Sequence, residues 1–234
     1  MIRTGLIASA LLIIVMLGLS LWAMPHLAGD GQFATHWNIN GQVDGTSNRA
    51  VILWLMPGIA AGIAALIAIL PRIDPRGRNL LRSSTAYLVI WIGALLILAT
   101  GHAIMVLNAT KMFDLADVSH GPGLLRWMSL LTGGLFTAMG AVMGKIRPNW
   151  FMGVRTPWTL SSDLSWDKTH RLAGWLFMLT GMATFFTALV LIPRWALVVL
   201  IGGIALTILI ALPYSWLVWK NDPARETLVP EDAD

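Results

Sequence analysis

The sequence predicts an all-α polytopic membrane protein with about six transmembrane helices and both termini in the cytoplasm. Three observations indicate this fold class: long apolar runs, few charged residues, and basic residues gathered in alternate loops. Only 12% of the 234 residues are charged and 56% are hydrophobic, whereas a soluble domain carries about 25% charged residues. The chain therefore has room for one membrane domain in contact with the lipid bilayer and for no separate soluble domain.

Six apolar runs are each long enough to cross a bilayer. A helix of about 20 residues spans the ~30 Å hydrocarbon core, and every run reaches about this length. They cover residues 5–24, 51–70, 86–107, 124–144, 172–192 and 195–217. We expect each run to form one transmembrane helix.

The positions of the basic residues predict the orientation. The loops after the second and fourth runs hold most of them: Arg72, Arg76, Arg78, Arg82, Lys145, Arg147, Arg155, Lys168 and Arg171. The opposite side holds Arg49, Lys111, Arg126 and Arg194. Cytoplasmic loops carry an excess of Lys and Arg, so both termini are expected inside the cell. The net charge of +4 thus reflects topology, and we expect no direct binding to nucleic acid.

We divide the chain into three parts. Residues 1–70 form a first helical pair joined by an outer loop, and residues 71–220 form a four-helix membrane part. Residues 221–234 are an acidic tail with two prolines, a composition typical of disorder. The sequence contains no cysteine, which excludes disulfides and thiol chemistry.

The outer loop between the first two runs carries a polar motif that starts with Thr35, His36 and Trp37. These three residues favour a short extended stretch, and the pairs Asn40-Gly41 and Asp44-Gly45 are typical turn dipeptides. His102 lies near the outer end of the third run, where we expect loop groups, Asp44 among them, to pair with it. The candidate ligand-facing residues are His36, Trp37, Asn38, Gly41, Asp44 and His102.

Three interpretations of this outer motif stay open. Its side chains can hydrogen-bond one another and the loop backbone, as Asn and Asp do in turns. They can also form a peptide-binding surface. Imidazole and carboxylate together can bind a divalent metal, for which His36, Asp44 and His102 are weak candidates; we expect neither a metal nor a cofactor.

The inner segment 145–171 is rich in tryptophan and capping residues. Pro157 interrupts any continuous helix, and Ser161 or Ser162 can cap a new helix that has Asp163 in its first turn. On that helix Asp163, Asp167 and His170 share one face. Trp150, Trp158, Trp166 and Trp175 are typical of interfacial anchors.

Small-xxx-small pairs at Gly58/Gly62 and Gly140/Gly144 predict close packing inside the bundle.

This segment also has three interpretations: a scaffold with anchors, a docking site for a protein, or a catalytic or metal site. The candidate docking residues are Asn149, Trp150, Gly153, Arg155, Thr156, Trp158, Trp166, His170 and Arg171. Two carboxylates and an imidazole can move protons, but no nucleophile elbow or phosphate-binding loop accompanies them. We expect no catalytic residue and no enzyme.

Both motifs resemble those of a known family. Thr35-His-Trp-Asn-x-x-Gly-x-x-Asp resembles the small N-terminal domain of unknown function found ahead of the SdpI family. Asn149-Trp-Phe-Met-Gly-Val-Arg-Thr-Pro-Trp, followed by Trp166-x3-His-Arg-x2-Gly, is similar to the signature of that family's C-terminal part. The family is named for the immunity protein against a sporulation-delaying peptide toxin.

The resemblance implies a multi-pass protein of the bacterial plasma membrane that confers immunity to a secreted, membrane-active peptide toxin. It also implies signalling, in which a small winged-helix autorepressor is held at the membrane. The outer motif would then face the toxin and the segment 149–171 the repressor. The competing functions are a small-solute transporter or channel, and a membrane enzyme or metal-binding protein using Asp163, Asp167 and His170.

Overall fold

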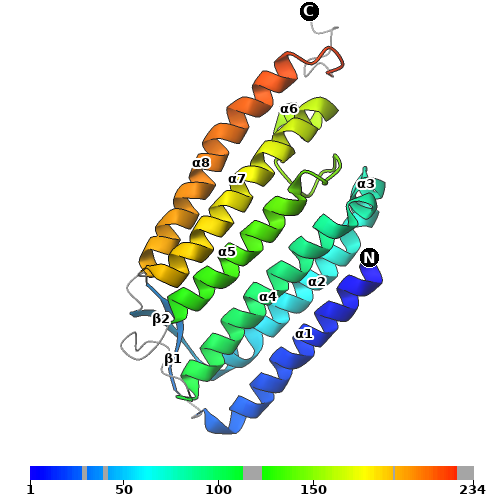
Figure 1. Ribbon diagram of the computed structural model, residues 1–234. Helices are drawn as coiled ribbons and strands as arrows, with labels where there is room; N and C mark the ends of the chain where they lie inside the picture. Colours follow the sequence, from blue (N-terminus) through cyan, green and yellow to red (C-terminus); the bar gives the residue numbers. More distant parts are fainter. Residues whose placement is uncertain (28–30, 39–41, 113–122, 192, 226–234) are drawn as a thin grey trace, which may run out of the picture.

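Six long antiparallel helices form a bundle in the computed structural model, which describes residues 1–27, 31–38, 42–112, 123–191 and 193–225 (Figure 1). These helices are α1 (Ile2–Ala23), α2 (Met56–Ile73), α4 (Ser84–Ala109), α5 (Leu124–Met143), α7 (Asp163–Val190) and α8 (Pro193–Lys220). Within the described residues, all of these except α5 are long and apolar enough to cross a membrane. The all-α polytopic membrane fold is therefore confirmed.

Helix α5 occupies the fourth predicted span but is less apolar than a spanning helix usually is. Arg126, one serine, two threonines and three glycines interrupt its aliphatic residues along 20 residues of helix. It packs against α4 on one side and α7 on the other (Figure 1). Neighbouring helices therefore cover much of the surface that a separate span would expose to lipid.

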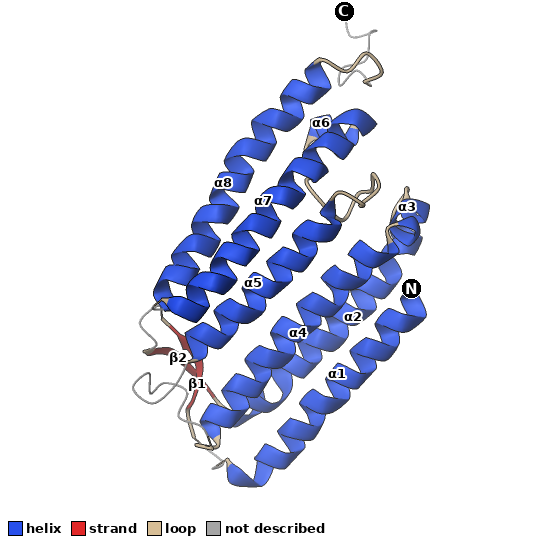
Figure 2. Cartoon of the chain, in the orientation of Figure 1, coloured by secondary structure: helices blue, strands red, loops and turns tan. Residues whose placement is uncertain are grey.

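Short elements occupy the two ends of the bundle. A 3₁₀-turn, η1 (Met24–His26), the strands β1 (Phe33–Trp37) and β2 (Val43–Ser47), and a π-helix, η2 (Val51–Leu55), lie between α1 and α2. Helices α3 (Gly77–Arg82) and α6 (Pro157–Leu160) lie at the opposite end. That end also holds the N-terminus and the end of α8, while the red strands of Figure 2 mark the hairpin end. We call these the hairpin end and the basic end.

The hairpin confirms one expectation and corrects another. The extended stretch over Thr35, His36 and Trp37 is strand β1, which pairs antiparallel with β2. The turn expected at Asp44-Gly45 is wrong, because both residues lie in β2. The register skips one residue on each strand, and Asp44 is the unpaired residue on β2. An Asp-Gly pair fits such a β-bulge as well as it fits a turn; Asn40-Gly41 lies outside the described residues.

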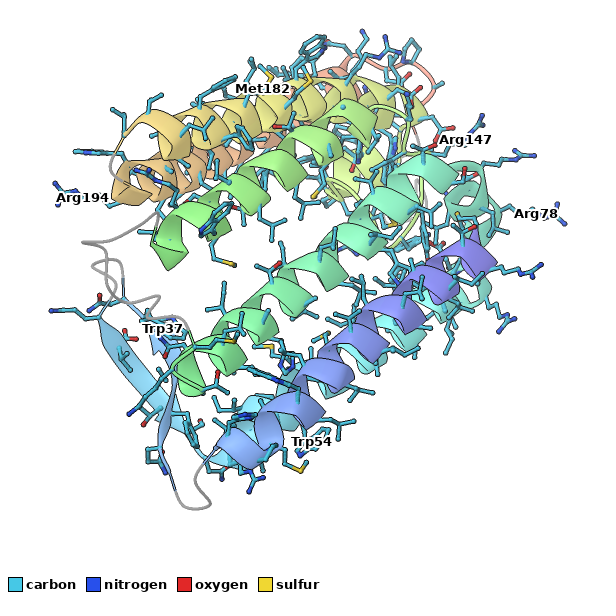
Figure 3. The ribbon with its side chains drawn as sticks, turned by 60° about the horizontal axis from the view of Figure 1, so that its bottom comes forward. Trp37, Trp54, Arg78, Arg147, Met182 and Arg194 are labelled. Atoms are coloured by element: carbon cyan, nitrogen blue, oxygen red, sulfur yellow. The ribbon has the colours of Figure 1, made fainter. Side chains whose placement is uncertain are left out.

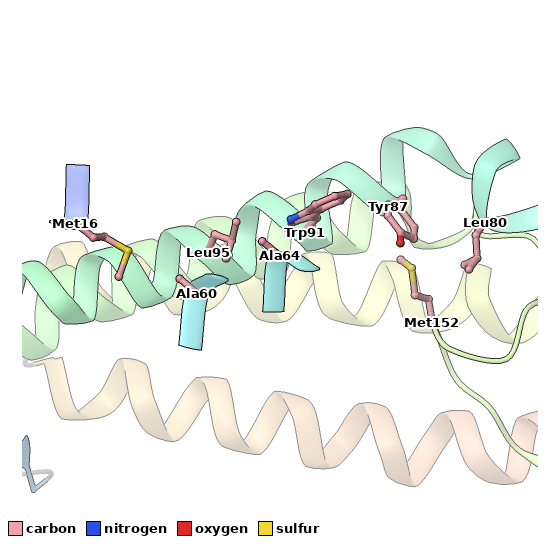
Figure 4. Packing of buried hydrophobic residues seen from close by; sticks show 8 residues of the cluster. All are labelled: Met16, Ala60, Ala64, Leu80, Tyr87, Trp91, Leu95 and Met152. Atoms are coloured by element: carbon pink, nitrogen blue, oxygen red, sulfur yellow. The ribbon is translucent and has the colours of Figure 1, made fainter. Parts of the chain in front are cut away.

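Two groups of three helices make up the bundle. Helices α1, α2 and α4 surround a core of Met16, Ala60, Ala64, Leu80, Tyr87, Trp91, Leu95 and Met152 (Figure 4). Met152 comes from the segment after α5 and lies beside Tyr87, so this segment closes the core at the basic end. Helices α5, α7 and α8 form the second group. The division at residue 70 stays a prediction, since α4 packs with α1 and α2.

Glycines set the close contact between α5 and α7. A Cβ atom on Gly140 would lie 2.5 Å from the Gly174 carbonyl oxygen, and one on Gly181 would lie 2.6 Å from the Gly133 carbonyl oxygen. Packing inside the bundle is thus confirmed for Gly140, where small residues let helix backbones approach. It is wrong for Gly58 and Gly62, which face away from the rest of the chain with no atom near their Cβ positions.

The basic residues separate along the bundle axis as the positive-inside pattern requires. Figure 3 shows Arg78 and Arg147 at the basic end and Arg194 at the hairpin end, near Trp37. The cytoplasmic location of the basic end stays a prediction from charge.

Candidate functional sites at the two ends of the bundle

The hairpin places His36 and Asp44 against each other on its exposed surface. His36 Nδ1 lies 2.5 Å from Asp44 Oδ1, and the side chains are 72% and 43% exposed. Asn38 Oδ1 accepts the Gln42 amide at 3.1 Å, which joins the residue after β1 to the residue before β2. The polar residues of the motif therefore pair across the hairpin while they remain accessible. Gly41 lies outside the described residues.

Trp37 joins the hairpin to the membrane helices. It packs on a buried cluster of Ala23, Leu27, Ile52, Leu53, Met105 and Val106, together with Phe33. The Arg49 guanidinium donates to the Met24 carbonyl at 2.5 Å and ties the end of the hairpin to the end of α1. Two contacts of different chemistry thus fix the hairpin on the bundle.

The expected pairing of His102 with loop groups such as Asp44 is wrong. His102 is fully buried, and its Nε2 lies 3.0 Å from Ser20 Oγ and 3.1 Å from the Met16 carbonyl. Ser20 Oγ also donates to the Leu53 carbonyl of η2 at 2.6 Å. His102 lies two helical turns before the end of α4, too deep for the loop, so helix α1 supplies its partners. His36, Asp44 and His102 therefore do not gather into one site.

Asn149 organises the segment after α5. Its Nδ2 donates to the carbonyls of Arg147 and Met152 at 2.9 and 3.1 Å, and its Oδ1 accepts the amides of Phe151 and Met152 at 2.9 and 2.6 Å. The residue is fully buried. Buried backbone groups need such partners, so the Asn149 side chain fixes the backbone conformation of the loop from inside.

His170 of α7 holds the same segment through a hydrogen bond of its imidazole ring. Its Nε2 accepts the Val154 amide at 3.0 Å, so Nδ1 carries the proton and donates to the Trp166 carbonyl at 2.9 Å. The ring stacks on Trp166 with centroids 4.1 Å apart, and Trp166 Nε1 donates to the Ile146 carbonyl at 2.7 Å. Gly153 has φ +107°, and its backbone passes close to Nε2 of the imidazole. Residues 145–156 are therefore held by contacts among themselves and with Trp166 and His170 of α7, and we call them the interlocked segment.

Helices α6 and α7 begin at caps that the sequence partly predicts. Thr156 caps α6 by accepting the Thr159 amide at 3.1 Å. Ser162 caps α7 by accepting the Ser165 amide at 2.9 Å, which confirms the predicted cap. Ser162 Oγ also donates to Asp222 Oδ2 at 2.5 Å, which joins the end of α8 to the start of α7.

Burial divides the nine candidate docking residues into two sets. Asn149, Thr156, Trp166 and His170 are buried and shape the segment from inside. The accessible residues are Trp150, Gly153, Arg155 and Arg171, with Trp158 partly exposed. The anchor role of Trp166 is wrong, because its indole is fully buried. The three residues predicted to share one helix face also differ in burial: Asp163 and Asp167 are exposed, whereas His170 is buried.

Sequence reasoning missed Asp74. This buried carboxylate accepts the Trp150 amide at 3.0 Å through Oδ2 and the Arg76 amide at 2.7 Å through Oδ1. It therefore joins the loop after α2 to the segment after α5. The available signal was Asp74-Pro75, a turn-forming pair inside an otherwise basic loop.

A polar cavity of about 1090 Å³ opens at the basic end between α3 and the start of α7. Four cations line it, Arg76, Arg82, Lys145 and Arg147, together with Asp163, Asp167 and Asp222. Sequence reasoning placed these residues in separate loops and did not predict their meeting. Within the described residues, no three side chains of the metal-ligating types gather into a metal site.

Two parts of the chain match models of known protein families. Residues 145–215 match the model of the SdpI/YfhL protein family, and residues 11–61 match a domain of unknown function, DUF1648. The resemblance to the SdpI family and to its N-terminal domain is therefore confirmed. The SdpI match contains the segment between α5 and α6, all of α6 and α7, and most of α8. The DUF1648 match contains most of α1, the hairpin and η2.

The SdpI match supports a multi-pass membrane protein of the immunity type in general. No curated protein and no solved structure matches the chain.

Proposed function

We propose that this protein protects a bacterial plasma membrane against a secreted, membrane-active peptide toxin, and that the hairpin is its toxin-facing surface. The exposed His36–Asp44 pair carries the proposal. It presents an imidazole and a carboxylate beside the membrane surface, on a hairpin fixed by Trp37 and Arg49. A rigid polar surface loses little conformational entropy when a peptide binds.

We also propose that the basic end reports toxin binding by holding a small winged-helix repressor. The accessible residues Trp150, Arg155 and Arg171 support this role, because exposed aromatic and arginine side chains are typical of interface hot spots. The Arg155 guanidinium donates to the Trp150 carbonyl at 2.6 Å, so the two residues are presented together. The proposal is non-enzymatic and assigns no catalytic residue and no cofactor.

The test is survival and membrane potential of a toxin-sensitive bacterium that expresses the chain and is challenged with the sporulation-delaying peptide. We expect the wild type to protect, and both His36→Ala and Asp44→Asn to lose protection. Thr46→Ala is the matched control, since Thr46 is equally exposed on β2 but lies outside the pair. Full protection by His36→Ala at equal membrane abundance would refute the hairpin as the toxin-facing surface.

The signalling part is tested separately by the membrane fraction of a co-expressed winged-helix repressor. We expect Arg155→Ala to release the repressor to the soluble fraction while protection against the toxin persists. Lys111→Ala, at the hairpin end, is the control and should leave the repressor bound. A repressor that never sediments with the membrane would refute this part alone.

A further inference from the structure

The polar cavity at the basic end has two walls of opposite charge. Arg82, Lys145 and Arg147 come from the end of α3 and the segment after α5, whereas Asp163 and Asp167 come from the first turns of α7. Asp163 and Asp167 stand at i and i+4, so they share a helix face. Among the described residues, one ion pair crosses the cavity, from Arg76 Nη1 to Asp163 Oδ1 at 4.0 Å. Within the described part of the chain no ion pair forms at four other charged residues of the lining: Arg82, Lys145, Arg147 and Asp167.

The cavity lies where the long helices α4, α5 and α7 begin or end. Arg82 lies two residues before α4 begins, and Lys145 and Arg147 follow within four residues of the end of α5. The acidic wall belongs to the first turns of α7. A basic pocket between transmembrane helices at this level is suited to phospholipid head groups.

A second, shallow groove of about 310 Å³ adjoins the cavity. Its apolar lining comes from Leu164, Tyr214, Leu217 and Val218, on α7 and α8. Leu164 lines both spaces and is 41% exposed. A molecule with a charged end and a hydrocarbon end can therefore occupy both at once.

We infer that the cavity binds the head group of an aminophospholipid such as phosphatidylethanolamine. The phosphate would accept hydrogen bonds from Arg82, Lys145 and Arg147, while the ammonium would donate to Asp163 and Asp167. Hydrogen bonds between ionised groups are the strong ones, and an ammonium offers three donors. One acyl chain would lie along Leu164 and Leu217.

The acidic wall decides between lipid classes. An anionic lipid such as phosphatidylglycerol offers no cation to Asp163 and Asp167, so its phosphate would face two unmatched carboxylates. A phosphatidylcholine carries a cation but no N–H donor. Unpaired charges and missing donors reject a competitor more strongly than lost apolar contact does. The site should therefore prefer ethanolamine over both.

The test is native mass spectrometry of the full-length protein in detergent, titrated with phosphatidylethanolamine, phosphatidylcholine and phosphatidylglycerol of identical acyl chains. We expect ethanolamine lipid to bind about tenfold more tightly than the other two, the effect of one charge-assisted hydrogen bond. Arg147→Gln should weaken binding of all three. Asp163→Asn combined with Asp167→Asn should abolish the preference for ethanolamine over choline.

The controls make each outcome decisive. Arg78→Gln changes an arginine of α3 that does not line the cavity and should leave binding unchanged. Equal or tighter binding of phosphatidylglycerol, or an equal loss in Arg78→Gln and Arg147→Gln, would overturn the inference. Glycerophosphoethanolamine, which lacks acyl chains, separates lipid from soluble ligand. Its binding should be weak, and affinity equal to that of the lipid would overturn the role of the groove.

Discussion

Gly153→Ala tests the interlocked segment at its tightest point. Gly153 has φ +107°, and a Cβ atom placed there would lie 2.1 Å from His170 Nε2. That nitrogen accepts the Val154 amide, and the ring stacks on Trp166. A single methyl group would therefore strain the backbone and displace the imidazole from its partners.

The expected loss of stability follows from two contributions. Holding a residue other than glycine in a sparsely populated backbone region costs about 1–3 kcal/mol. Leaving the partly buried Val154 amide without its acceptor costs up to about 1–3 kcal/mol more. The sum is about 2–6 kcal/mol, a large share of the stability of an ordinary domain.

The assay is thermal unfolding of the purified protein in detergent, followed by tryptophan fluorescence. Gly134→Ala is the matched control, because the Cβ position of Gly134 has no neighbouring atom within 4 Å. The double variant Gly153→Ala/His170→Ala separates the contributions, since removing the ring leaves only the backbone cost and makes the two changes non-additive. Equal melting temperatures for Gly153→Ala and Gly134→Ala would refute the reasoning.

Three further predictions concern the same end of the bundle and the contact between α5 and α7. Gly140→Ala should destabilise the protein by about 1–3 kcal/mol, because its Cβ would meet the backbone of α7, while Gly134→Ala serves again as control in the same melts. Asn149→Asp should cost about 1–3 kcal/mol, since a carboxylate cannot donate to the Arg147 and Met152 carbonyls; unchanged protease resistance of the segment would contradict this. The hydrogen bond from Ser162, followed by that from the Ala224 amide, lowers the pKa of Asp222. The stabilisation is therefore present above the ordinary aspartate pKa and is lost as the pH falls through the lowered value. Melting temperatures from about pH 7 to about pH 3 should fall less steeply for Asp222→Asn than for the wild type, and identical slopes would contradict the assignment.

Sequence patterns predicted the elements of this fold better than their contacts. Length and hydropathy located the spans, and the serine next to Asp163 gave the start of α7. Burial was harder to predict, because a membrane helix is apolar all round and its sequence does not show which face meets protein. Periodicity placed His170 with Asp163 and Asp167, yet only His170 is buried. Gly58 and Gly140 look alike in sequence, but only the second meets a neighbouring helix.

The missed contacts join residues distant in the chain. Asp74 and Trp150 are separated by 76 positions, and Ser162 and Asp222 by 60. No local pattern specifies such pairs. His102 illustrates the same difficulty, since its position near an outer loop suggested Asp44, whereas α1 supplies the nearer partners.

The π-helix η2 has a consequence for insertions and deletions. A π-turn accommodates one residue more than an α-turn does, and η2 directly follows the hairpin at the start of α2. Deleting a single residue from Val51–Leu55 would let the segment rewind as α-helix. The α-turn would complete the same full turn with one residue fewer, so the hairpin would keep its direction and the membrane span would continue unbroken. In this protein the segment Val51–Leu55 can thus absorb the loss of one residue while the hairpin and the bundle keep their relative orientation.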